Sequence, residues 1–205
     1  MLKTKKIVMI LLSMLLVCSM VGCGDQEPAF KPLPIDVNGA KILLGQSTLQ
    51  AFIDAGYKVT LDKTLKEDIA GEKMPTMTYD VAAYVSKDNK IVGMVSFLNN
   101  TKDTLPFEEC IVNEYEITYK DPSWTGQYDT DNVLVDGIKC KGMMIDDVKK
   151  AFKDKVESFD EFKNPDGSIG VMSFELNGVH ISVHFDYTTK EATTVETEVF
   201  LSYFE

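Results

Sequence analysis

Strict alternation of apolar and polar residues marks the C-terminal third of the chain as β-sheet. In Val179–Tyr187 the apolar residues fall at odd positions and the polar ones at even positions. Gly170–Leu176 precedes this segment, and the Asn177-Gly178 dipeptide between the two is the strongest short signal for a β-hairpin. Thr193–Tyr203 follows. We therefore predict a three-stranded antiparallel meander with one packed face and one face in solvent.

The middle of the chain carries the same kind of signal. Thr76–Ser86 and Lys90–Leu98 are strand-like segments joined by the polar turn Lys87–Asn89. Glu109–Lys120 is a further predicted strand, reached through a polar loop. These segments predict a second antiparallel meander.

A helical pattern precedes each group of strands. In the first helix, Leu49, Phe52 and Ile53 lie on one face at i, i+3 and i+4. Ser47 and Gln50 have the spacing of a capping box.

The second predicted helix carries an apolar stripe from Ile145 to Phe159, with lysines on the opposite side. Both helices follow a turn, a short apolar segment and a glycine. We therefore predict an α+β fold of two tandem helix-plus-antiparallel-meander units. The first unit spans Ile35–Asp121 and the second Val133–Glu205, and Pro122–Asn132 links them.

The first 22 residues have the pattern of a secretion signal. Three lysines precede the eleven residues Ile7–Val17, in which Ser13 is the only polar side chain. Eleven residues span about 16 Å as a helix, whereas a bilayer core of about 30 Å takes about 20 residues. The run is too short for a stable membrane span and fits the apolar core of a signal peptide.

Met20–Cys23 resembles the lipobox of bacterial lipoproteins, with methionine where leucine is usual. The resemblance implies cleavage after residues 1–22 and attachment of lipid to the sulfur of Cys23. Two or more acyl chains make a stable anchor. Residues 23–34, with three prolines, are then a lipidated tether. We expect the protein at the cell membrane, facing outside the cytoplasm.

Charge narrows the classes of partner. The chain has 32 acidic residues, 21 lysines and no arginine. Residues 1–22 contain three lysines and no acids, so the remainder carries a net charge of −14. Nucleic-acid binders need clustered basic residues, which excludes that class. The missing guanidinium groups also remove the usual bidentate contact to phosphate or carboxylate ligands.

Two cysteines, Cys110 and Cys140, follow Cys23. In an exported protein such a pair forms a disulfide in many cases, here closing a loop of about 31 residues worth roughly 3–4 kcal/mol. The alternative is that both are small buried side chains. The sequence leaves both open.

The sequence shows no catalytic constellation, so we predict a protein without enzymatic activity, metal or cofactor. His180 and His184 are the only histidines. They share one strand face but lie about 13 Å apart along it, too far to bind one zinc ion at about 2 Å each. We interpret them as residues of the solvent face, and the sequence leaves open whether they take part in binding.

Three aromatic residues join the histidines as candidates for partner binding. Tyr84 and Phe200 fall on the predicted solvent faces of their strands. They either line a protein-binding concavity or lie where the two sheets meet. Trp124 lies in the linker, and tryptophan is enriched at interface hot spots. It equally fits a role in covering the seam between the units.

The order of elements resembles the tandem-repeat beta-lactamase inhibitory protein and the small outer-membrane assembly lipoproteins. Asn38–Tyr57 resembles uncharacterised secreted lipoproteins of low-GC Gram-positive bacteria. The resemblance implies a polar sheet surface that contacts a protein. We expect a membrane-anchored extracytoplasmic lipoprotein acting as a non-enzymatic protein-interaction module. The alternatives are a lipoprotein that binds a small ligand or peptide, and an envelope-associated accessory protein.

Overall fold

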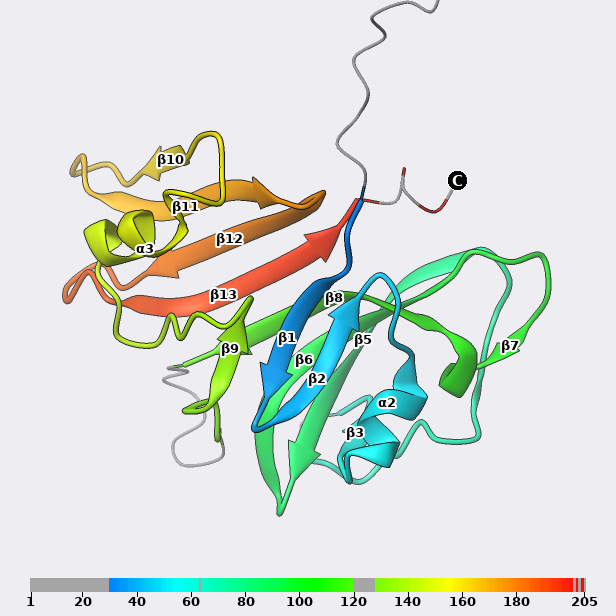
Figure 1. Ribbon diagram of the computed structural model, residues 1–205. Coiled ribbons are helices and arrows are strands. Elements are labelled where there is room, and N and C mark those ends of the chain that lie inside the picture. Colours follow the sequence, from blue (N-terminus) through cyan, green and yellow to red (C-terminus); the bar gives the residue numbers. More distant parts are fainter. Residues whose placement is uncertain (1–29, 63, 120–127, 201, 203, 205) are drawn as a thin grey trace, which may run out of the picture.

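β-Sheet dominates the protein (Figure 1). The computed structural model describes residues 30–62, 64–119, 128–200, 202 and 204. Strands account for 48% of the structure and helices for 11%. The expectation of an α+β fold built from tandem helix-plus-meander units is therefore wrong, because the helical part is too small.

Both helices are shorter than their sequence patterns suggested. Helix α2 spans Leu49–Asp54 and helix α3 spans Ile145–Phe152. α2 ends because Gly56 adopts a left-handed φ of +78° and its N–H donates to the carbonyl of Ile53. The apolar stripe of α3 extends to Phe159 only because the irregular segment after the helix also packs its apolar side chains on the core.

The predicted capping box of α2 is also wrong. The N-cap is Thr48, which makes no side-chain cap hydrogen bond. Ser47 Oγ instead accepts a hydrogen bond from the backbone N–H of Leu43 at 2.9 Å. The serine therefore closes the turn that enters the helix and leaves the helix N-terminus uncapped by a side chain.

One antiparallel sheet of eight strands runs through the described structure in the order β10-β11-β12-β13-β8-β6-β5-β3. Its strands are β3 (Lys58–Thr60), β5 (Thr78–Lys87), β6 (Lys90–Asn99), β8 (Ile111–Thr118), β10 (Asp160–Lys163), β11 (Ile169–Leu176), β12 (Val179–Phe185) and β13 (Ala192–Val199). The two halves meet where β13 pairs with β8. At this seam Thr197 lies opposite Tyr115, and the Thr197 hydroxyl donates to the Tyr115 carbonyl at 2.8 Å.

Two smaller sheets complete the structure. A three-stranded sheet has the order β2-β1-β9, and a two-stranded sheet pairs β4 with β7. Their strands are β1 (Leu33–Val37), β2 (Ala40–Leu44), β9 (Val133–Val135), β4 (Lys73–Met74) and β7 (Leu105–Pro106). The 3-10 helix η1 (Phe107–Glu109) follows β7. β9 comes from the second half of the chain but pairs with β1 from the first.

The three-stranded sheet, α2 and α3 all lie against one face of the large sheet (Figure 1). Phe52 of α2 stacks on Tyr115 of β8 with ring centroids 6.3 Å apart. Phe152 of α3 lies 4.7 Å from Phe174 of β11. These contacts place the core on that face. No helix in the described part of the chain is long and apolar enough to cross a membrane.

Candidate binding face

The opposite face of the large sheet carries polar, partly exposed side chains. Along β12, the apolar residues are buried and the polar residues between them are half-exposed, as the alternation predicted. We call this surface the open face. It is defined, from β11 to β5, by Ser173, Glu175, His180, Ser182, His184, Glu196, Glu198, Glu114, Glu116, Met94 and Tyr84, with Phe200 beyond the end of β13.

One row of directly opposed residues crosses the open face. Tyr84 of β5 lies opposite Met94 of β6, and Met94 lies opposite Glu116 of β8. Glu116 is opposite Glu196 of β13, which is opposite Ser182 of β12. With strands about 4.8 Å apart, Tyr84 lies about 19 Å from β12. The row therefore connects the candidate tyrosine to the strand that carries both histidines.

Four of the candidate residues from the sequence share this face. His180 and His184 flank Ser182 on β12, and Phe200 lies beside His180 with ring centroids 5.9 Å apart. Phe200 is 37% exposed and Tyr84 is half-exposed. Ser182 Oγ lies 3.1 Å from His180 Nε2.

Cys23, with the signal segment before it, and Trp124 lie outside the described residues.

The open face also holds two directly opposed pairs of glutamates that the sequence reasoning missed. Glu116 of β8 lies directly opposite Glu196 of β13, and Glu114 lies directly opposite Glu198. Directly opposed like charges destabilise a sheet. The alternating acids in both segments were visible, but the pairing of β8 with β13 was needed to place them side by side.

The contacts to these carboxylates come mostly from neutral groups. Ser96 Oγ donates to Glu114 Oε2 at 2.7 Å, and Thr118 Oγ1 donates to Glu116 Oε1 at 2.8 Å. Glu198 is exposed, and its carboxylate makes no hydrogen bond or ion pair with the described residues. A hydroxyl donor carries no net charge, so these two hydrogen bonds do not remove the repulsion between the opposed carboxylates.

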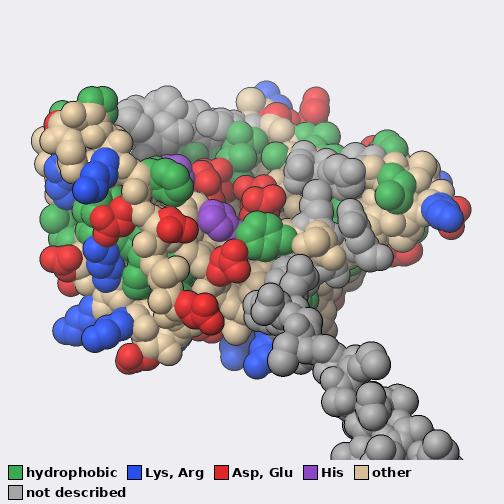
Figure 2. Space-filling view, turned by 90° about the horizontal axis from the view of Figure 1, so that it is seen from above, with side chains coloured by type: hydrophobic (Ala, Val, Ile, Leu, Met, Phe, Trp, Pro, Cys, Tyr) green, Lys and Arg blue, Asp and Glu red, His purple; other side chains and the backbone are tan. Residues whose placement is uncertain are grey.

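His184 lies close to the carboxylate of Glu196. Its Nε2 lies 3.2 Å from Glu196 Oε1, is shielded from solvent and has no hydrogen-bonding geometry to a partner. Figure 2 looks onto this side of the molecule, where both histidines lie among acidic side chains with hydrophobic side chains beside them. The face is acidic, with aromatic residues toward its margins.

Cys110 and Cys140 are free and buried. Burial raises the pKa of Cys110 to about 11 and that of Cys140 to about 12. The Cys110 thiol donates to the carbonyl of Pro106 at 3.4 Å. The structure therefore holds both as small core side chains and contains no bridge between them.

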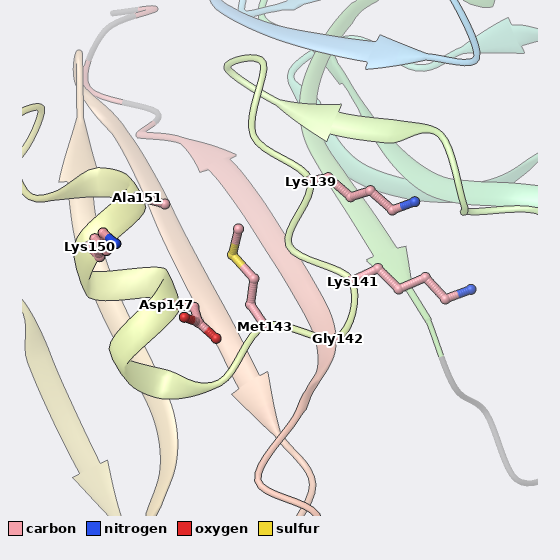
Figure 3. Close-up of a pocket in the computed structure, with 7 residues that line it drawn as sticks. All are labelled: Lys139, Lys141, Gly142, Met143, Asp147, Lys150 and Ala151. Carbon is pink, nitrogen blue, oxygen red and sulfur yellow. The ribbon is translucent and has the colours of Figure 1, made fainter.

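A second candidate surface surrounds the start of α3. A hollow of about 550 Å³ is lined by Lys139, Lys141 and Lys150 together with Met143 and Asp147. Figure 3 shows Lys139 and Lys141 extending side by side away from α3, so the ammonium groups do not converge. Asp147 accepts a hydrogen bond from the Met144 N–H and so occupies the helix N-terminus. We assign no anion site here.

Metal chemistry has no visible basis in the described residues. No group of three or more histidine, cysteine, aspartate or glutamate side chains in that part of the chain is arranged to hold a metal ion. The open face therefore offers charge and shape rather than a coordination centre.

Fold and site together define a mostly-β protein with an acidic sheet surface that the described residues leave open. Comparison with family models, curated proteins and solved structures gives no match for this chain.

Proposed function

We propose that this protein is a membrane-anchored extracytoplasmic lipoprotein that works as a non-enzymatic protein-interaction module. Its binding surface is the open face, and its partner is a protein that presents lysine or arginine side chains to that face. One observation carries the proposal, namely the two directly opposed glutamate pairs across β8 and β13.

The opposed glutamates destabilise the free protein and favour a cationic partner. Each opposed glutamate pair costs the free protein a few tenths of a kcal/mol, and the hydroxyl donors do not neutralise it. A lysine or arginine placed between two carboxylates turns this repulsion into attraction. The chain's high negative charge adds long-range steering, which speeds the encounter with a cationic partner.

Aromatic residues toward the margins of the acidic cluster supply the apolar part of such an interface. Phe200 lies beside His180 at one margin, and Tyr84 with Met94 lies across the sheet at another. Large, partly exposed aromatic side chains gain most when a partner covers them. The open face thus combines an acidic centre with apolar anchors.

The lipid anchor rests on the Met20–Cys23 run and its resemblance to a lipobox. Contacts at the start of the fold bear on where an anchored protein would sit. Phe30 contacts Phe204 with ring centroids 6.4 Å apart, and the Lys31 N–H donates to the Asn177 carbonyl at 3.1 Å. Seven residues after Cys23 the chain therefore already belongs to the fold, which limits its distance from the anchor to about 25 Å.

Site-specific photo-crosslinking in intact cells tests this function. A benzophenone amino acid replaces Tyr84 or Phe200 on the open face, or Tyr187 as a matched aromatic control at the β12–β13 turn, where it is 59% exposed. We expect one adduct of the same mass at Tyr84 and Phe200 and none at Tyr187. The adduct should weaken as salt rises, and its crosslinked peptides should contain lysine or arginine. Equal adducts at all three positions, or none on the open face, would refute the proposal.

A further inference from the structure

A cavity of about 830 Å³ lies at the turn between β11 and β12, at one end of the large sheet. One wall is the β11–β12 hairpin, on which Glu175 and His180 are directly opposed. The other wall is the segment from α3 to β10, with Glu157 and Asp160. His180 therefore belongs to both the open face and the cavity, which we call the end cavity.

Apolar side chains form part of the end cavity. Phe174 lines it and is only 3% exposed, with the rings of Phe152 and Phe159 at 4.7 and 5.3 Å. Val156 lines it as well and is half-buried. An alkyl chain that enters the cavity can cover the exposed part of Val156 while its polar end stays near the carboxylates.

Negative charge exceeds positive charge in the lining. Two lysines face the three carboxylates named above, but Lys155 is already engaged. Its ammonium lies 2.7 Å from Asp136 Oδ2 and 3.3 Å from the Asp136 carbonyl. Lys31 is then the one lysine in the lining whose charge these contacts leave available. A cationic group is the occupant that this balance favours.

We propose that the end cavity receives a lysine or arginine side chain from the protein that binds the open face. This proposal rests on the function proposed above and adds a position to it. The alkyl stem lies on Val156, and the cationic head lies among Glu157, Asp160 and Glu175. Because the cavity is continuous with His180, one basic side chain enters it while neighbouring ones lie over the glutamate pairs.

Fluorescence polarisation of the intact chain in detergent tests the end cavity. The probe is a fluorescein-labelled octapeptide of alternating lysine and alanine, and the same peptide with acetylated lysines checks the need for charge. The cavity variant is Glu157→Gln with Asp160→Asn, which changes two carboxylates of the cavity that are not part of the open face. The matched control is Glu67→Gln with Glu72→Gln, two exposed acids on the other half of the chain that give the same change in net charge.

A third variant, Glu196→Gln with Glu198→Gln, removes one carboxylate from each pair on the open face. We expect the cavity variant to weaken binding of the lysine peptide at least about fivefold more than the control does, at fixed salt. Each amide keeps the shape of the carboxylate side chain that it replaces. Thermal unfolding of each variant verifies that the fold is intact.

The three variants separate this proposal from the function on which it rests. If the face variant weakens binding while the cavity variant matches the control, the end cavity proposal is wrong and the open face stands. If all three variants weaken binding equally, net charge alone attracts the peptide, and both proposals are wrong.

Discussion

Glu198 provides the sharpest test of the idea that the open face is built at the expense of stability. Glu198 is exposed and lies directly opposite Glu114. Its carboxylate makes no hydrogen bond or ion pair with the described residues. Glu198→Gln therefore removes a repulsion without removing a contact. We predict that this variant is more stable than the wild type and binds the basic partner less tightly.

The expected gain follows from the strand geometry. Directly opposed Cβ atoms in an antiparallel pair lie about 4.5–5.5 Å apart, and exposed carboxylates can turn to about 6 Å. Two unit charges at about 6 Å in water repel by about 0.7 kcal/mol. Cross-strand pairs contribute about 0.2–1 kcal/mol in general. We therefore expect the free energy of unfolding to rise by about 0.5 kcal/mol.

Urea denaturation at pH 7 measures this gain. With an m-value of about 2 kcal/mol per molar, the midpoint should move up by about 0.25 M at low salt. The difference should shrink toward zero at 1 M salt, where the Debye length is about 3 Å. Glu72→Gln, which changes an exposed acid remote from the open face, is the control and should leave the midpoint unchanged.

A double-mutant cycle assigns the effect to the pair. In the background of Glu198→Gln, the further change Glu114→Gln should give about 0.5 kcal/mol less stability than it does in the wild type. The reasoning fails if Glu198→Gln lowers stability at low salt, or if the two changes are additive. Either result would mean that the opposed glutamates do not repel.

Gly93, the two buried cysteines and Cys23 each allow a direct test of the core or of the anchor. Gly93→Ala should destabilise by about 1–3 kcal/mol in thermal unfolding, because its Cβ would lie 2.5 Å from the buried Tyr115 ring, and a wild-type midpoint would contradict this. Cys110 and Cys140 should resist alkylation by iodoacetamide at pH 8 until the chain unfolds. Peptide mapping measures the alkylated fraction of each cysteine. Their raised pKa values add stability that is full below pH ~8.5 and is lost as pH rises toward 11 and 12, so stability should fall above pH ~8.5. Cys23→Ala should abolish labelling with radioactive lipid, and continued labelling would refute the anchor.

Local chemistry made the hairpins predictable from the sequence. Asn177 and Gly178 both adopt positive φ between Leu176 and Val179, as the Asn-Gly signal indicated. The turn after Lys87 behaves in the same way. Short-range backbone preferences decide such turns, so one sequence is enough to find them.

Short strands and the class of fold were not predictable in the same way. β3 and β9 have three residues each, too few to establish an alternating pattern in the sequence. β10 has four residues, all exposed, so no apolar side marks it. α3 has eight residues, but its apolar pattern in the sequence is longer because the irregular segment after it also buries apolar side chains. Burial patterns report packing, and packing extends beyond the helix ends.

The candidate site depended on one long-range pairing. His180 and His184 could be placed on a solvent face from alternation alone, and the structure puts them there. Four strand pairings place Tyr84 in the same row as Ser182, and among them the pairing of β8 with β13 joins segments far apart in the chain. No local signal carries that information, because the pairing is set by contacts between residues far apart in the chain.

Energetics at the β8–β13 seam explain why the sheet tolerates a repulsive outer surface. On the inner side Val195 lies opposite Ile117, and both are fully buried. Burial of such side chains stabilises by about 1.5–3 kcal/mol each, against about 0.5 kcal/mol lost per glutamate pair. The buried Thr197 hydroxyl adds a hydrogen bond to the Tyr115 carbonyl across the same seam. The inner face thus determines the pairing, and the outer face is free to carry charges that serve a partner.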